Sequence, residues 1–149
     1  MSGELAGQWA LILGASSGFG AATAQELARR GMHIIGVHLD RRAALAGVEE
    51  LVKSLQGAGV QALFFNVNAA DPAKRQEVLD QVQPKLGGSP ITVLMHSLAF
   101  GTLKPYIADD PKGRIARRDM DMTLDVMGHS LVYWTQALVS SGLLASGGR

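Results

Sequence analysis

Short, almost wholly apolar runs alternate along the chain with longer segments whose apolar residues recur every three or four positions. Apolar runs of this length predict strands that are buried on both faces, as in a parallel sheet. The expected strands are residues 9–13, 33–37, 61–65 and 91–95, and the expected helices are 18–30, 43–56, 119–138 and one that starts at Asp71. This order predicts a doubly wound α/β fold of four strands with right-handed crossovers.

Some helix ends carry clear signals. Asp71 precedes Pro72, and an aspartate followed by a proline is a strong helix start. Gly31 follows the first helix and is expected to close it. Residues 100–118 show no periodicity and predict a loop before the last helix. That helix carries an apolar stripe that is expected to be buried, formed by Leu124, Met127, Leu131, Trp134 and Leu138.

Composition restricts the class of protein. A length of 149 residues corresponds to one domain, and 47% hydrophobic residues are enough to form a core. A net charge of +1 without a long run of one sign argues against nucleic-acid binding as the main role. The lack of cysteine excludes disulfides, thiolate metal sites and a cysteine nucleophile. Because we find neither a signal-peptide pattern nor an apolar stretch of about 18 residues, we expect a cytoplasmic protein without membrane attachment.

Glycine is enriched, at 18 residues, and three glycines lie between the first strand and the first helix with the spacing G-x-x-x-G-x-G. Glycine lets the backbone approach a phosphate closely, and the free N–H groups of the following helix favour an anion. The spacing in this strand–loop–helix context predicts a dinucleotide site on a Rossmann-type sheet. The contacts expected from the loop are Gly14, Ser16, Ser17, Gly18, Phe19 and Gly20.

The same loop allows two other interpretations. Gly14-x-Ser16-x-Gly18 matches the nucleophile elbow G-x-S-x-G, which would make Ser16 an acyl-transfer nucleophile. That hypothesis gives no role to Gly20, and only 15 residues precede Ser16 to supply an oxyanion-hole loop. The other interpretation is a tight turn that binds no ligand.

The glycine pattern resembles the N-terminal half of the short-chain dehydrogenase/reductase family. In that family the end of the second strand selects the cofactor, because an acidic residue favours NAD and a basic residue favours NADP. Here His38 and Leu39 stand at the usual positions, followed by Asp40, Arg41 and Arg42. Guanidinium groups suit a 2′-phosphate, so the resemblance favours NADP, while Asp40 keeps NAD open. Leu39, Asp40 and Arg41 are the expected cofactor contacts in this segment.

Two later segments also carry the resemblance. Asn66-Val67 follows the third strand, where the family usually has Asp-Val around the adenine. Residues 96–101 (HSLAFG) follow the fourth strand and are similar to the His-Ser-Ile-Gly-Phe form of the enoyl-acyl-carrier-protein reductase branch. Asp125 agrees with that branch, which has an aspartate in the last helix. The resemblance implies cofactor contacts from Asn66, Val67, Ser97, Leu98 and Ala99.

Two side-chain groups near these segments have a functional and a simpler interpretation. In the enoyl reductase branch the residue at His96 shapes the floor of the nicotinamide pocket and is not a proton shuttle. A basic cluster precedes the last helix, and it either docks an acidic acyl carrier protein or is an ordinary solvated loop. The cluster consists of Lys112, Arg114, Arg117 and Arg118.

The catalytic tyrosine and lysine of the family have no counterpart here, so we predict no catalytic residue and no metal site. Tyr106 is followed by Lys112 but lies in the loop after the fourth strand, and Tyr133 has no lysine after it. The chain stops at Gly147-Gly148-Arg149, and family members often have Gly-Gly-Arg just before the fifth strand. We therefore expect residues 1–149 to be an NAD(P)-binding domain truncated before that strand, inactive alone, with the fourth strand as an open edge.

Three functional hypotheses follow from the resemblance. The leading one is the NADP(H)-binding half of a short-chain reductase that transfers hydride to an enoyl thioester. A 3-oxoacyl or carbonyl reductase of the same family is the alternative, and a non-catalytic dinucleotide-sensing module is the third. The resemblance further implies a homo-oligomer, an acyl thioester or carbonyl substrate, and a missing C-terminal half as partners.

Overall fold

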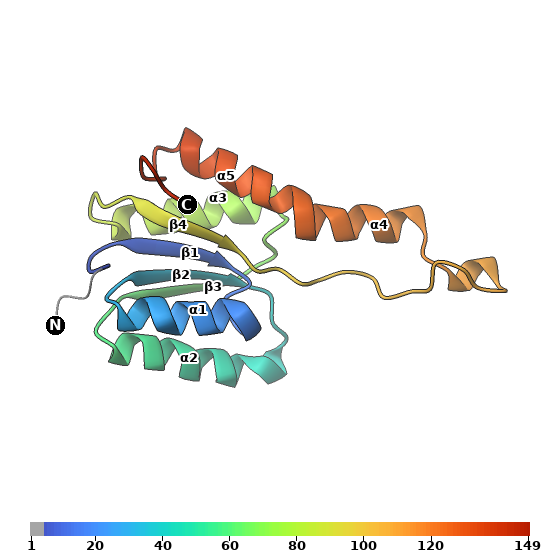
Figure 1. Cartoon of the computed structure of the whole chain (residues 1–149), viewed down its shortest axis with the longest axis horizontal. Coiled ribbons are helices and arrows are strands. Elements are labelled where there is room, and N and C mark those ends of the chain that lie inside the picture. Colours follow the sequence, from blue (N-terminus) through green and yellow to red (C-terminus); the bar gives the residue numbers. More distant parts are fainter. Residues whose placement is uncertain (1–4) are drawn as a thin grey trace.

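A parallel four-stranded sheet lies at the centre of residues 5–149, the part of the chain that the computed structural model describes (Figure 1). The strand order is β3-β2-β1-β4, with one helical crossover between each pair of consecutive strands. The strands are β1 (Trp9–Leu13), β2 (His33–His38), β3 (Ala62–Asn66) and β4 (Ile91–His96). All four predicted strands are therefore present, within one residue of the expected bounds.

Helices cover both faces of the sheet (Figure 1). On one face lie α1 (Gly18–Arg29) and α2 (Leu45–Gly57), and on the other lie α3 (Pro72–Val82) and α5 (Ser130–Ser140). Side chains along β1 alternate between two apolar clusters, one on each face, and all five residues of the strand are buried. The predicted doubly wound fold is confirmed. Within residues 5–149, no helix has the length and apolar character needed to cross a membrane.

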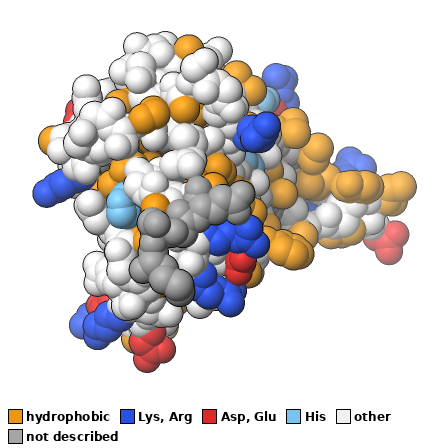
Figure 2. All heavy atoms as spheres, turned by 60° about the vertical axis from the view of Figure 1, so that its left-hand side comes forward, with side chains coloured by type: hydrophobic (Ala, Val, Ile, Leu, Met, Phe, Trp, Pro, Cys, Tyr) orange, Lys and Arg blue, Asp and Glu red, His pale blue; other side chains and the backbone are white. Residues whose placement is uncertain are grey.

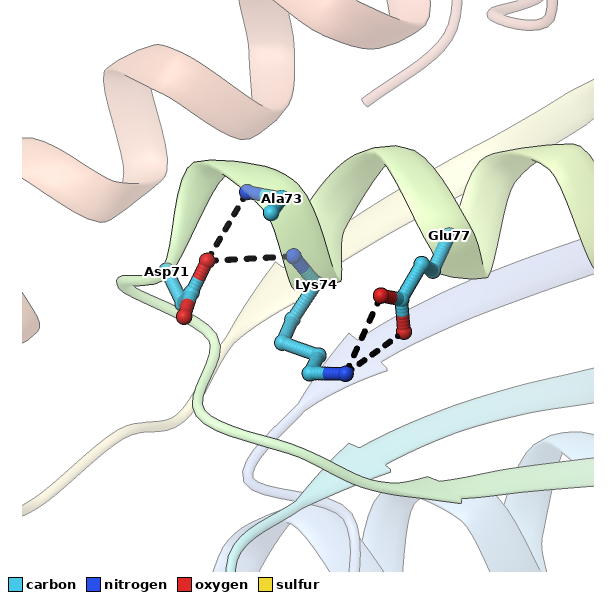
Figure 3. A network of polar contacts seen from close by, with 4 residues as sticks. All are labelled: Asp71, Ala73, Lys74 and Glu77. Carbon is cyan, nitrogen blue, oxygen red and sulfur yellow. Dashed lines mark hydrogen bonds and ion pairs between the residues drawn. The ribbon is translucent and has the colours of Figure 1, made fainter.

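The start of α3 is as predicted from the Asp-Pro pair. The Asp71 carboxylate accepts hydrogen bonds from the backbone N–H groups of Ala73 (2.8 Å) and Lys74 (3.1 Å), as Figure 3 shows. Pro72 occupies the first helical position, where no N–H is needed. These bonds satisfy donors that the helix itself leaves free. The apolar residues Val78, Leu79 and Val82 of α3 are buried, as is Leu86 in the turn that follows.

The last helix differs from its prediction in bounds and in burial. It starts earlier, as α4 (Arg117–Leu124), passes through a π-helical turn (Asp125–His129) and continues as α5 to Ser140. Trp134 and Leu138 of the expected stripe are buried, but Leu124, Met127 and Leu131 are 41–50% exposed. The prediction of one buried stripe is wrong for these three residues. Leu124 lies on α4, which runs past the end of the sheet (Figure 1).

The outer edge of β4 also differs from expectation. Leu143 accepts a hydrogen bond from the Ile91 N–H (2.7 Å), and Ala145 donates one to the Ile91 carbonyl (2.8 Å). Further along, Leu94 donates to the Arg149 carbonyl (2.8 Å). The predicted open edge is therefore wrong for residues 91–94, because the chain returns from α5 and lies along this part of the strand.

Residues 97–116 form an arm that leaves the sheet beyond β4 and leads to α4 (Figure 1). Hydrophobic side chains gather on the projecting part of the molecule (Figure 2), and Leu103, Tyr106 and Ile107 are 80–100% exposed. The arm is held to α4 by an ion pair between Lys104 and Asp119 (3.0 Å). The predicted loop therefore has a defined path, with one short 3₁₀ turn at 111–113.

Candidate functional site

A cleft of about 400 Å³ lies at the carboxyl ends of the strands. Open α/β sheets bind ligands at the carboxyl ends of their strands, at the topological switch point where the strand order reverses. In this sheet the switch point lies between β1 and β4. Eleven of the fourteen residues that the sequence predicted line this one cleft. They are Gly14, Ser16, Ser17, Gly18, Phe19, Leu39, Asp40, Val67, Ser97, Leu98 and Ala99.

The other three predicted residues lie outside the lining. Gly20 is buried beneath the loop. Arg41 is exposed and does not line the cleft. Asn66 makes two hydrogen bonds to the backbone of Asp40. Its Oδ1 accepts from the Asp40 N–H (2.9 Å), and its Nδ2 donates to the Asp40 carbonyl (3.1 Å). Gly20 therefore supports the loop from beneath, and Asn66 fixes the backbone of Asp40 without lining the cleft.

The glycines of the loop hold it close to its neighbours. A Cβ on Gly14 would overlap the Ser97 carbonyl, and a Cβ on Gly20 would overlap the carbonyl of Gly14. Gly18 has a φ of 54°, yet no atom lies within 4 Å of the position that its Cβ would take. Gly14 and Gly20 are thus needed because other backbone atoms lie too close for a side chain, whereas Gly18 leaves space beside the cleft.

The N-terminus of α1 offers free donors at this space. Ser17 is the N-cap residue but its side chain makes no capping hydrogen bond, and the first turn has no acidic residue. Within residues 5–149, the N–H groups of Gly18, Phe19 and Gly20 have no hydrogen-bond partner. Unpaired N–H groups and the helix dipole together favour a negatively charged ligand group.

Asp40 places a carboxylate in the cleft. A hydrogen bond from the Ser16 hydroxyl lowers the pKa of Asp40 below its usual value, burial opposes this, and His38 lowers it further. The Asp40 Oδ2 lies 2.8 Å from the His38 Nδ1. Because the carboxyl is ionised at neutral pH, Nδ1 carries the proton and donates. The cleft therefore has an anion-binding side at α1 and an ionised acceptor at the end of β2.

Sequence reasoning missed six lining residues as contacts, namely His38, Asn68, Ala69, Phe100, Met122 and Val126. Asn68 and Ala69 extend the predicted 66–67 segment, and Phe100 extends the 97–99 segment. Met122 and Val126 are four positions apart on the last helix, so their shared face was visible in the sequence. The spacing did not predict the path of the arm, which places this helix over the cleft.

Other candidate residues lie apart from the cleft lining. Ser130 donates to the Val126 carbonyl (2.6 Å), so its oxygen accepts from the His96 Nε2, 2.8 Å away. His96 is thus hydrogen-bonded to the first residue of α5, directly after the π-helical turn. Tyr106 is 80% exposed on the arm, and Tyr133 lies on α5 beside Arg75. Within the described residues, no cluster of His, Asp or Glu is suited to hold a metal ion.

The comparisons with known proteins agree with this geometry. A family model described as "short chain dehydrogenase" matches residues 8–149. D-threitol dehydrogenase of Mycolicibacterium smegmatis is 32% identical over 97% of this chain, and very-long-chain 3-oxoacyl-CoA reductase of Anas platyrhynchos is 30% identical over 81%. A solved short chain dehydrogenase of Burkholderia cenocepacia in complex with NADP is 26% identical, with a TM-score of 0.73 over 97% of this chain.

This chain covers only part of these proteins. It spans 51% of the threitol dehydrogenase, 35% of the 3-oxoacyl-CoA reductase and 54% of the Burkholderia protein. The family match gives no support to the hypothesis that Ser16 is a hydrolase nucleophile. Neither relative is named as an enoyl reductase, so the finer assignment to that branch is not supported by them. The match over residues 8–149, together with the glycine loop and the parallel sheet, shows that this chain belongs to the short-chain dehydrogenase family.

Proposed function

We propose that this chain is the dinucleotide-binding part of a short-chain reductase that reduces a carbonyl group, with 3-oxoacyl thioesters as the substrate class. The observation that carries the proposal is the cleft itself. It combines a glycine loop, the free N–H groups of α1 and the Asp40 carboxylate at the switch point of the sheet.

The donor set fits a dinucleotide. The N–H groups at the start of α1 would bind the pyrophosphate, and Asp40 would accept a hydrogen bond from a ribose hydroxyl. Val67 and Leu39 offer apolar surface for the adenine, and Ser97 to Ala99 form the wall at the end of β4. When bound, the dinucleotide supplies the hydride, and the residues of this chain bind and orient it.

The choice between NAD(H) and NADP(H) depends on Asp40 and Arg41. Arg41 and Arg42 supported NADP(H) at the level of the sequence, and the Burkholderia relative was solved with NADP. In this chain, however, the ionised Asp40 lines the cleft, and neither Arg41 nor Arg42 does. A carboxylate repels a 2′-phosphate and accepts from a free hydroxyl, so we favour NAD(H).

Two substrate classes remain in the proposal, in a definite order. Reduction of a carbonyl is favoured because the relative from Anas platyrhynchos is named as a 3-oxoacyl-CoA reductase. Reduction of an enoyl thioester is the second candidate, because residues 96–101 and Asp125 resemble the enoyl reductase branch.

The test is an assay of the protein that carries this chain, with acetoacetyl and crotonyl thioesters and either nicotinamide cofactor. We expect faster oxidation of the cofactor with the acetoacetyl thioester. Faster turnover of the crotonyl thioester would support the second candidate and contradict the first. Dinucleotide binding with no turnover of either thioester would overturn both and leave a sensing module.

A further inference from the structure

We propose that His38 is a positioning residue for Asp40 and that, together with Ser16, it sets how strongly the cleft discriminates against a 2′-phosphate. The inference rests on the proposed function, because it concerns the selectivity of the same dinucleotide site. Neither side chain was expected to act on selectivity through Asp40, and His38 was not a predicted contact.

His38 is fixed in place from several sides. Its side chain is only 5% exposed, and its ring packs against the ring of Phe64 on β3, with 6.0 Å between the centroids. Its carbonyl accepts a hydrogen bond from the Val67 N–H (2.8 Å). The Nδ1–H that reaches Asp40 therefore comes from a ring that is held by the sheet.

Asp40 itself is held at its backbone by Asn66, which bonds to both its N–H and its carbonyl. The carboxylate of Asp40 is in turn held by His38, whose Nδ1 lies 2.8 Å from Oδ2. The Ser16 hydroxyl also acts on this carboxylate, because it lowers the pKa of Asp40. Ser16 belongs to the glycine loop and lines the same cleft as Asp40, so the two side chains are available to the same ligand.

The chemical consequence is selectivity. A carboxylate can accept about four hydrogen bonds, and the two from His38 and Ser16 leave acceptor sites for ribose hydroxyls. A 2′-phosphate would bring a charge of about −1.5 to −2 next to the same carboxylate, and it would offer this carboxylate no hydrogen-bond donor. If Asp40 loses its bond to His38, it can turn away from the cleft, and the penalty against the phosphate falls.

The test measures equilibrium binding of NADH and NADPH to the protein that carries this chain, and compares the ratio of the two Kd values among variants. His38→Leu removes the donor and keeps the bulk of an apolar side chain. His38→Asn keeps an N–H donor near the position of Nδ1. We expect the preference for NADH to fall about tenfold in His38→Leu, and we expect the same fall in Asp40→Asn. The preference should be retained in His38→Asn.

A general loss of structure would weaken both nucleotides together and leave the ratio unchanged. His33→Leu is the matched control, because His33 lies at the other end of β2, where it accepts from the Gln61 N–H (3.0 Å). Ser16→Ala, in the loop, is expected to shift the ratio in the same direction as His38→Leu. It also keeps the test valid if His38→Leu does not fold.

Three results would overturn the inference. An unchanged ratio in both His38→Leu and Ser16→Ala would show that Asp40 needs neither partner. A ratio that changes equally in His38→Asn and His38→Leu would remove the role of the donated hydrogen bond. A wild-type preference for NADPH that is abolished by Arg41→Ala would assign selectivity to Arg41. Failure of the folded wild type to bind either nucleotide would instead overturn the proposed function.

Discussion

Each glycine of the loop between β1 and α1 has different surroundings, and substitutions there separate folding from binding. A Cβ on Gly20 meets backbone, whereas a Cβ on Gly18 meets open space. We expect Gly20→Ala to lower the free energy of unfolding by about 1–3 kcal/mol through overpacking. Gly18→Ala should cost only about 1 kcal/mol, for its positive φ. Urea unfolding of both variants checks this, and equal costs would contradict the packing that we describe.

The carboxyl group of Asp40 makes stability depend on pH. Because its bonds to Ser16 and His38 lower its pKa in the folded state, their stabilisation is present above the unfolded pKa of about 3.9. It is lost as the pH falls through the lower, folded value. We expect Asp40→Asn to reduce the unfolding free energy most near neutral pH, and the difference from wild type to shrink below about pH 4. A difference independent of pH would contradict this.

At the scale of single residues, sequence reasoning located the contacts that lie on one continuous loop. Gly14 to Phe19 and Ser97 to Ala99 are short segments directly after strands, so the fold places them together. His38 was missed as a partner of Asp40, because the side chain of a strand residue can face either way. The exposure of Arg41 had no sequence signal, since charged residues suit both a phosphate and open solvent.

At the scale of elements, the N-terminal cap of α3 gives a direct prediction. Asp71→Ala removes the acceptor for two backbone N–H groups, so the free energy of unfolding should fall by about 1 kcal/mol. Asp71→Ser should retain most of the stability. Glu77→Ala is the matched control, because its ion pair with Lys74 is about half exposed and contributes little. If the control costs as much as Asp71→Ala, the cap does not stabilise α3.

The elements that the sequence predicted well are those whose periodicity is set by burial on the sheet. β1 is apolar throughout because both of its faces are covered, and α3 has its stripe because one of its faces is buried in an apolar cluster that includes side chains of β1 and β2. The last helix was predicted less well. Its apolar stripe continues past the sheet, so periodicity alone did not distinguish the buried Trp134 from the exposed Leu124. Residues 143–149 lie along β4, but the only apolar run in this segment, Leu143 to Ala145, is too short to predict a strand.

At the scale of the whole molecule, the family resemblance implies a homo-oligomer, and we propose that it forms through the exposed part of that stripe. Met120, Leu124, Met127 and Leu131 are three or four positions apart along the last helix, and all are 41–50% exposed. We expect Leu124→Glu with Leu131→Glu to shift sedimentation toward the monomer. Gln136→Glu, on the opposite side of α5, should have no effect. A double variant that associates as strongly as wild type would exclude this helix from the interface.

The central claim is that the cleft beside the glycine loop binds a nicotinamide dinucleotide, and Gly18→Asp tests it most directly. The new side chain has room, since no atom lies within 4 Å of the Cβ position, and its charge stands where the pyrophosphate would bind. We predict saturable binding of NADH by the wild type and loss of that binding in a folded Gly18→Asp variant, both measured by calorimetric titration. Equal affinity in the two proteins, or no binding by the wild type, would contradict the account.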